Sequence, residues 1–175
     1  SELRDGMKIL TRYLLDRGYK RLAYITGPDG VYALDCRREG FLDAAREYGL
    51  KDSDTVLLPL GEVTYSAACE GAKRLLPRIN ELDAVICVND MMALGVVNTL
   101  GQHGISVPND IAVAGFDDVI FAVASPSPLT TVRQDIEGVA RESVSLLQRL
   151  IKGHPVDQAE DVLLPAGLVV RQSTK

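Results

Sequence analysis

The sequence predicts an α/β protein of the doubly wound type, in which a mostly parallel sheet carries helices on both faces. The apolar runs Ala84–Val88 and Ile111–Phe116 are continuous rather than alternating, as expected for strands that are buried on both sides. Between them lies Met91–His103, a segment of helical length that a glycine follows. A strand, a helix and a second strand in this order form one unit of a parallel sheet.

Polar residues follow both apolar runs at the point where each predicted strand ends. Asn89 and Asp90 come directly after the first run, and Asp117 and Asp118 come after the second. In open α/β sheets, ligands bind at the carboxyl ends of the strands. The sequence therefore predicts one candidate binding edge that these four side chains share.

The first part of the chain is predicted to add two strands and three helices. Residues 2–17 and 37–48 carry apolar side chains at helical spacing, and a glycine follows each segment. Residues 21–25 and 55–60 are short apolar runs that lead into glycine-containing loops, as strands do. A third helix is expected over residues 65–78.

The last part of the chain begins with a crossing segment at 121–128, where two prolines disfavour regular structure. Residues 129–133 then form a short predicted strand. A long helix is expected over 135–151, because an aspartate suited to capping precedes apolar residues at helical spacing. The apolar segments 162–165 and 168–171 are expected to form a final strand or a pair of strands.

Composition and charge exclude several classes of protein. The 175 residues are 46% hydrophobic and 25% charged, which is typical of a soluble chain with one domain or two small lobes. No apolar run approaches the roughly 18 residues of a membrane span, and the polar start does not resemble a signal peptide. The net charge is -5 and the basic residues are scattered, so this chain alone is not expected to bind DNA.

The residues that most often carry catalysis or bind metals form no recognisable pattern. Cys36, Cys69 and Cys87 are widely spaced and odd in number, which favours buried, reduced thiols in a cytoplasmic protein. His103 and His154 are too few and too distant from any motif for a zinc site or a catalytic triad. The glycines match neither a dinucleotide-binding nor a phosphate-binding loop. We expect no metal, no cofactor and no enzymatic activity.

Five short motifs occur in an order that resembles the effector-binding core of the lactose-repressor (LacI/GalR) family. Each is weak alone, but their order makes the resemblance specific, and it covers nearly the whole chain. The motifs are Val-Asn-Asp-x-x-Ala-Leu-Gly at 88–95, Val-Pro-x-Asp-Ile at 107–111, Gly-Phe-Asp-Asp at 115–118, Pro-Leu-Thr-Thr-Val at 128–132 and Arg-x-Ser-Thr at 171–174.

The resemblance implies a periplasmic-binding-protein-like fold, in which two lobes joined by three crossovers hold the effector between them. On this basis residues 1–124 and 160–175 form the C-terminal lobe. Residues 125–159 supply a crossover, a strand and a helix that belong to the other lobe. One complete lobe and a fragment of the second are therefore expected, without the N-terminal helix-turn-helix that reads DNA in this family.

The resemblance also assigns effector-binding roles to particular residues. Arg37, three residues before Gly40, matches the family's effector arginine, whose planar donors suit a pair of hydroxyls or a carboxylate. Asn89 and Asp117 match the family's asparagine and aspartate contacts. The family's stacking aromatic falls either on Tyr65, which is the nearest aromatic, or on Val63, which the alignment of the helix favours.

The remaining positions at the predicted edge are assigned with less support. Asp118 is expected to cap or bond the following loop, and Asp90 to cap the helix that starts there, which leaves Asn89 free to face a ligand. Val31 and Ala33 stand where some relatives have polar contacts, which indicates a smaller or less polar ligand.

Two functions fit these observations. The first is the effector-sensing part of a LacI-type repressor, which binds a small sugar-like metabolite and acts on operator DNA only through the missing domain of a homodimer. The alternative is a periplasmic sugar-binding protein of a transporter. The 128–132 and 171–174 motifs and the free cysteines favour the first. Because the cover of the 135–151 helix belongs to the other lobe, we also expect this helix either to dock back on its own lobe or to pair with a second copy.

Overall fold

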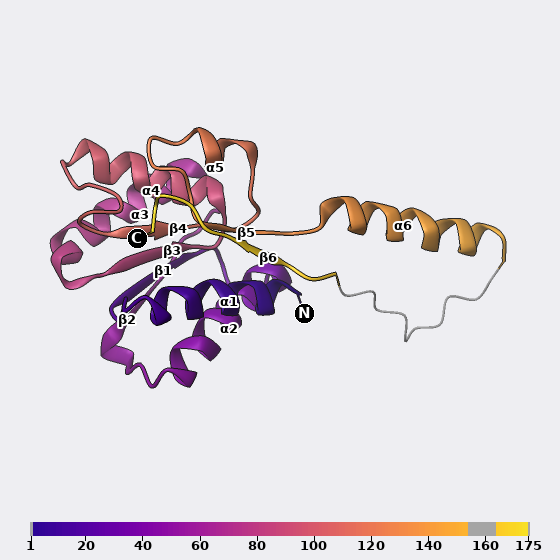
Figure 1. Cartoon of the computed structure of the whole chain (residues 1–175), viewed down its shortest axis with the longest axis horizontal. Coiled ribbons are helices and arrows are strands. Elements are labelled where there is room, and N and C mark those ends of the chain that lie inside the picture. The colour runs from indigo at the N-terminus through magenta and orange to yellow at the C-terminus, as the bar shows by residue number, and fades with distance from the viewer. Residues whose placement is uncertain (1, 154–163, 175) are drawn as a thin grey trace.

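The protein is built on a four-stranded parallel sheet (Figure 1). The computed structural model describes residues 2–153 and 164–174. Within them the strand order is β2-β1-β3-β4. The strands are β1 (Leu22–Thr26), β2 (Thr55–Pro59), β3 (Ala84–Cys87) and β4 (Ala112–Ala114).

The strand order reverses next to β1, which places a topological switch point between β1 and β3. The chain adds β2 on one side of β1 and then continues with β3 and β4 on the other. At such a point the loops after neighbouring strands run in opposite directions and leave a crevice at the carboxyl edge of the sheet. The predicted doubly wound α/β fold is confirmed.

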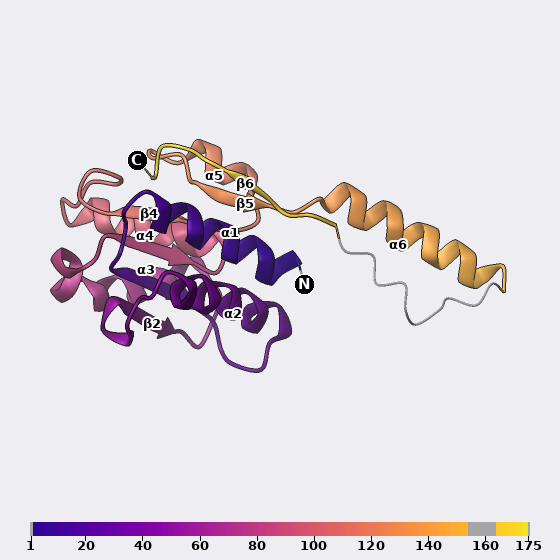
Figure 2. The same ribbon diagram turned by 60° about the horizontal axis from the view of Figure 1, so that its bottom comes forward.

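Two pairs of helices cover the sheet (Figure 2). They are α1 (Glu2–Asp16) with α2 (Tyr32–Glu47), and α3 (Tyr65–Leu75) with α4 (Asp90–Gln102). Glycines let the helices of each pair approach closely. A Cβ atom at Gly40 would lie 2.1 Å from the carbonyl oxygen of Arg4, and one at Gly95 would lie 2.6 Å from that of Tyr65.

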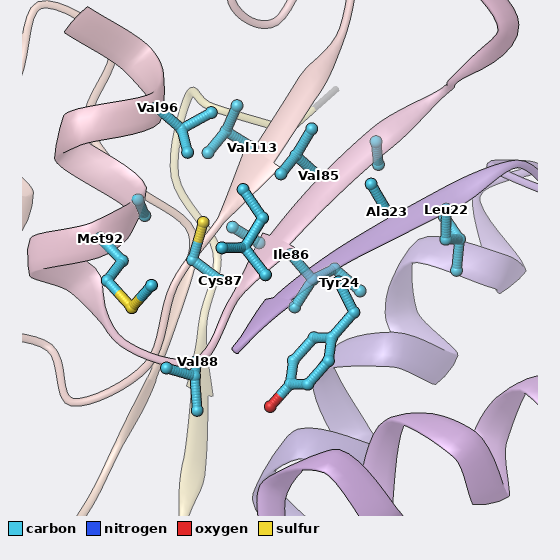
Figure 3. Packing of buried hydrophobic residues seen from close by; sticks show 14 of the residues in the cluster. Leu22, Ala23, Tyr24, Val85, Ile86, Cys87, Val88, Met92, Val96 and Val113 are labelled. Atoms are coloured by element: carbon cyan, nitrogen blue, oxygen red, sulfur yellow. The ribbon is translucent and has the colours of Figure 1, made fainter. Parts of the chain in front are cut away.

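The core lies between the sheet and the helices. Strands β1, β3 and β4 are buried along their whole length, which explains their continuous apolar sequences. Tyr24 of β1 stacks on Phe41 of α2 with ring centroids 4.9 Å apart, and Figure 3 shows Tyr24, Ile86 and Met92 among the packed side chains. Burial of each large apolar side chain contributes about 1.5–3 kcal/mol to stability.

The last third of the chain leaves the lobe and returns to it. Strand β5 (Thr131–Arg133) pairs antiparallel with β6 (Gly167–Val169). Between them, α6 (Ile136–Ile151) extends away from the rest of the protein (Figures 1 and 2). After β6 the chain rejoins the sheet, where the backbone N–H of Val113 donates to the carbonyl of Ser173 at 3.0 Å. Helix α6 therefore does not dock back on its own lobe.

Two predicted helices differ from the structure, and one short helix was not predicted. Helix α2 starts at Tyr32, five residues before the predicted start. Its N-cap residue is Val31, which has an extended backbone and no side chain that can cap, so the sequence carries no signal for this start. Helix α3 stops at Leu75 and continues as the 3₁₀ helix η2 (Leu76–Glu81), whose second residue is a proline. A second short 3₁₀ helix, η1, spans Asp52–Asp54.

The segment predicted to be irregular at 121–128 begins with a helix. Helix α5 spans Ile120–Ala124 and ends before Pro126 and Pro128, so the prolines stop the helix rather than prevent it. Leu164 and Pro165, predicted to lie in a strand, are in neither a helix nor a strand, and residues 162–163 lie outside the described residues.

Candidate functional site

The structure brings Arg37 and Asp117 together at the carboxyl edge of the sheet. Nη2 of Arg37 donates to Oδ1 of Asp117 at 2.8 Å, and Nη1 donates to the carbonyl of Val88, at the end of β3, at 2.7 Å. The guanidinium lies 4.0 Å from the centre of the Phe116 ring, a cation–π contact. Arg37 is only 8% exposed, so the arginine is a fixed part of this edge.

The position of Arg37 in its helix differs from the prediction. The predicted helix over 37–48 puts Arg37 in its first turn, where the positive charge would oppose the helix dipole. Since α2 begins at Tyr32, Arg37 lies in the second turn, and its charge is balanced by Asp117. Because the helix is longer than predicted, the Arg37 charge no longer lies in the first turn, where it would oppose the helix dipole.

Asp117 keeps one carboxylate oxygen available. Its Oδ1 accepts from both Arg37 and Gln134, each at 2.8 Å, whereas Oδ2 accepts no hydrogen bond from the described residues. The side chain is 28% exposed. Burial raises the pKa of Asp117, and the Arg37 charge and both hydrogen bonds oppose that rise. A ligand hydroxyl could donate to the remaining oxygen.

Asp117 and Asp118 both adopt a backbone conformation that is rare outside glycine. Their φ angles are 109° and 53°. Strained residues of this kind persist where the surrounding structure over-determines them, and they cluster at ligand sites. The turn that presents Asp117 to the crevice is therefore held against its local preference.

The Asp118 carboxylate pairs with two arginines of the crossing segments, one in β5 and one just after β6. Nη2 of Arg171 lies 2.7 Å from its Oδ1, and Nε of Arg133 donates to its Oδ2. Burial alone would raise the pKa of Asp118, but the two arginines together lower it. The expectation that this side chain bonds the following loop is wrong, because the turn directs it toward β5 and β6.

Asn89, and not Asp90 as predicted, caps α4 in the structure. Asn89 has extended backbone angles and caps α4, since its Oδ1 accepts from the N–H of Met92 at 2.9 Å. Asp90 is the first helical residue and its carboxylate is buried away from the helix terminus. The side-chain amide of Asn89 donates to none of the described residues, so capping still leaves it a donor for a ligand.

The other residues predicted to contact the effector lie in two places. Val63 lies next to Gly27, the loop residue after β1, because a Cβ at Gly27 would be 2.4 Å from its Cγ2. Val31 and Ala33 flank the start of α2 and are at least partly exposed. Tyr65 instead lines a groove of about 820 Å³ over α4 and α5, which includes neither Arg37 nor Asp117.

Sequence reasoning missed two residues of this cluster. Gln134 lies 17 residues after Asp117, in the link between β5 and α6, and no spacing rule connects the two. The sequence predicts Phe116 only as the last residue of a buried strand. Its contact with Arg37 could have been foreseen from the order of strands, which brings the end of β4 beside that of β3.

The described residues offer no sign of a metal centre or a membrane span. Among residues 2–153 and 164–174, no group of three or more His, Cys, Asp or Glu side chains could hold a metal ion. In the same ranges, no helix combines the length and apolar character that crossing a membrane requires.

A parallel sheet with helices on both faces and a charged cluster at its switch point is typical of α/β lobes that bind ligands at the carboxyl edge of the sheet. The chain belongs to the family of periplasmic binding protein-like domains, whose family model matches residues 11–174. The predicted periplasmic-binding-protein-like fold is thereby confirmed.

The relatives include transcriptional regulators of the LacI/GalR type. The chain is 34% identical over 172 residues to the regulator CelR of Thermobifida fusca, covering 96% of this chain and 49% of CelR. It is 34% identical over 170 residues to GalR of Escherichia coli K12, covering 97% of this chain and 49% of GalR. It thus spans about half the length of these relatives.

A solved structure supports the same relationship. The complex of the transcriptional regulator CelR with cellobiose superposes with a TM-score of 0.90 at 31% identity, covering 98% of this chain and 52% of CelR. The resemblance read from the five motifs is confirmed. The relatives named here are regulators rather than enzymes or transporter components.

Proposed function

We propose that this chain is the effector-sensing lobe of a LacI/GalR-type repressor and binds a small sugar-like metabolite through Arg37, Asn89 and Asp117. The observation that carries the proposal is the Arg37–Asp117 ion pair at the switch point, where Asp117 keeps one oxygen without a partner in the described part of the chain. Asn89, which follows the Val88 carbonyl that accepts from Arg37, adds its side-chain amide as a donor. Binding, rather than catalysis, is the role these fixed polar groups serve.

The charge balance of the site favours a neutral, hydroxylated ligand. The positive charge of Arg37 is already matched by Asp117, so a ligand anion would meet an unpaired carboxylate oxygen. A sugar hydroxyl can donate to that oxygen and accept from the Asn89 amide. Val31 and Ala33 at the start of α2, and Val63 next to Gly27, are apolar residues in segments that follow β1 and β2. The related CelR structure contains the disaccharide cellobiose.

The other half of the ligand site would come from a second lobe. Helix α6 extends from the lobe with six large apolar side chains exposed, and the chain spans about half the length of its relatives. We propose that residues 125–159 cross over to that second lobe and supply α6 to it, and that 1–124 and 160–175 form this lobe. Leu129 and Val132, at the start of the crossing segment, are still buried in the core of this lobe. Operator DNA would be read by a separate N-terminal domain of the intact, cytoplasmic regulator.

The intact regulator is proposed to be a homodimer. The groove over α4 and α5 is lined without a single charged residue, although a quarter of the chain is charged. Leu94 and Phe121 lie in it, and Phe121 is 59% exposed. A second copy would cover this surface in an isologous contact, the commonest closed arrangement.

A thermal-shift screen of sugars tests the function directly. Ligand at about 100 times its dissociation constant should stabilise the protein by about 2.7 kcal/mol. Arg37→Ala and Asp117→Ala should each remove a charge-assisted contact worth about 1.5–3 kcal/mol, roughly 10- to 150-fold in affinity. In the intact regulator, both variants should lose induction and retain operator binding.

Arg38→Ala is the matched control, because Arg38 is the adjacent arginine but pairs with Asp29 and Asp35 at the surface. It should bind sugar like the wild type. Unchanged sugar affinity in either Arg37→Ala or Asp117→Ala would overturn the site assignment.

A further inference from the structure

Asp90 contacts the strained Asp117–Asp118 turn on both of its sides. Its backbone N–H donates to the carbonyl of Phe116, just before the turn, at 2.8 Å. Its carboxylate oxygen Oδ2 accepts from the backbone N–H of Val119, just after the turn, at 2.9 Å. The two aspartates with positive φ angles lie between these bonds.

The second oxygen of Asp90 connects the same turn to the crossing strand β5. Oδ1 accepts from the hydroxyl of Thr131 at 2.6 Å, and that hydroxyl accepts from the backbone N–H of Asp118 at 3.3 Å. One carboxylate oxygen of Asp90 therefore bonds the residue after the turn, and the other bonds the threonine that accepts from the turn itself. The residue itself is fully buried and cannot reach a ligand.

Gly115 leaves room for this arrangement. A Cβ atom there would lie 2.2 Å from Oδ1 of Asp90 and 3.0 Å from its Cα. The φ angles of Asp117 and Asp118 are costly for residues with side chains, and such angles persist only where the neighbours hold them. The bonds from Asp90 provide this restraint from the adjacent strand end.

We propose that Asp90 is a positioning residue of the ligand site, which holds the Asp117–Asp118 turn so that the Asp117 carboxylate meets Arg37. Its importance for ligand binding rests on the function proposed above, whereas the restraint on the turn does not. Burial raises the pKa of Asp90 to about 6, in spite of its bonds to Thr131 and Val119. Its carboxylate is buried and bonds Val119 and Thr131, whereas the helix cap of α4 is supplied by Asn89.

Amide exchange of Val119, followed by NMR in the 175-residue chain, tests the restraint without any ligand. Asp90→Ala removes both acceptors and should increase exchange of this amide at least about tenfold. Asp90→Asn should restore the protection, because its oxygen can accept from Val119 and its amide can donate to Thr131. Thr11→Ala is the control, since it removes a fully buried hydroxyl that bonds the Met7 carbonyl of its own helix and not the turn.

A second pair of variants covers the case in which Asp90→Ala does not fold. Thr131→Val removes the hydroxyl that donates to Asp90, and Thr131→Ser keeps it. Faster Val119 exchange in the valine variant alone supports the proposal. Equal exchange in both variants, or in Asp90→Ala and Thr11→Ala, overturns it.

Cellobiose serves as the probe for the link to binding. If wild type binds it, Asp90→Ala should weaken its affinity at least about tenfold, while Asp90→Asn and Thr11→Ala should retain it. Unchanged affinity in Asp90→Ala would refute the positioning role in binding. If no variant binds any sugar while Val119 exchange still responds to Asp90→Ala, the ligand proposal fails and the restraint on the turn survives.

Discussion

Gln134 donates a hydrogen bond of 2.8 Å to Asp117, on the same oxygen that accepts from Arg37. Gln134 lies in the link between β5 and α6, the segment that leaves the lobe. The carboxylate proposed to receive a ligand is therefore bonded to the crossing chain as well as to its own lobe. A ligand that moves Asp117 would change the position of this link, which is a physical route for signalling between lobes.

The Gln134→Ala variant should separate this connection from binding itself. It removes one neutral donor, worth about 0.5–1.5 kcal/mol, so we expect a loss of sugar affinity of only about 2- to 10-fold. Induction of the intact regulator should fall further than affinity does. Titration of sugar binding and operator release in parallel would show this, and an equal loss in both would contradict a signalling role.

The helix pair α1–α2 should not tolerate a side chain at Gly40. A Cβ atom there would lie 2.1 Å from the carbonyl oxygen of Arg4, a backbone atom that cannot rotate away. Gly40→Ala should therefore destabilise the protein by about 1–3 kcal/mol or more in urea unfolding.

Gly101→Ala is the matched control. Gly101 lies in α4, and a Cβ there meets no atom within 4 Å. Alanine should stabilise this helix by about 0.5–1 kcal/mol, because glycine loses more conformational freedom on folding. Similar stability of both variants would refute the close approach of α1 and α2.

Most of the sheet could be predicted from the sequence, because strands β1, β3 and β4 are short, continuous apolar runs. The cap of α4 could not, since Asn89 and Asp90 are both good capping residues and tertiary contacts decide between them. Thr131 and Val119 provide partners for the Asp90 carboxylate, and neither is close to it in sequence.

The charged network around the Asp117–Asp118 turn could not be predicted from the sequence for a similar reason. Adjacent carboxylates at 117 and 118 predict that the two side chains point in different directions, which is correct. The arginines that bind Asp118 lie 15 residues or more away, on strands whose pairing depends on the path of α6. The positive φ angles that separate the two carboxylates have no signature in a pair of aspartates.

Asp90 should make stability depend on pH in a direction opposite to that of most carboxylates. Burial raises its pKa from 3.8 to about 6, and the facing charges of Asp117 and Asp118 add to the rise. The folded protein then binds a proton more tightly than the unfolded chain does. The stabilisation from Asp90 is complete below about pH 4 and is lost as the pH rises through about 6.

Asp90→Asn tests this sign, because asparagine has no charge to bury and keeps both hydrogen bonds. A rise in pKa from 3.8 to about 6 corresponds to about 3 kcal/mol, so the variant should gain stability over wild type by up to this amount at pH 7. The gain should disappear near pH 4. Unfolding in urea at several pH values measures it, and a constant difference between the two proteins would contradict the raised pKa.

Helix α6 should make the isolated chain self-associate. Six of its large apolar side chains are 45% or more exposed, namely Ile136, Val139, Val144, Leu147, Leu150 and Ile151. Full burial of each would contribute about 1.5–3 kcal/mol, on the order of 10 kcal/mol together, which is comparable to the stability of a whole domain.

The structure leaves pairing with a second copy as the way to bury this face, because α6 does not fold back on its own lobe. Val144→Asp with Leu147→Asp places two charges on the apolar face and should make the chain associate less than the wild type in sedimentation experiments. Ser145→Asp with Gln148→Asp adds the same charge to the same helix on its polar side and should associate like wild type. A strictly monomeric wild type would exclude pairing. Equal association of the two double variants would show that the contact does not involve the apolar face of α6.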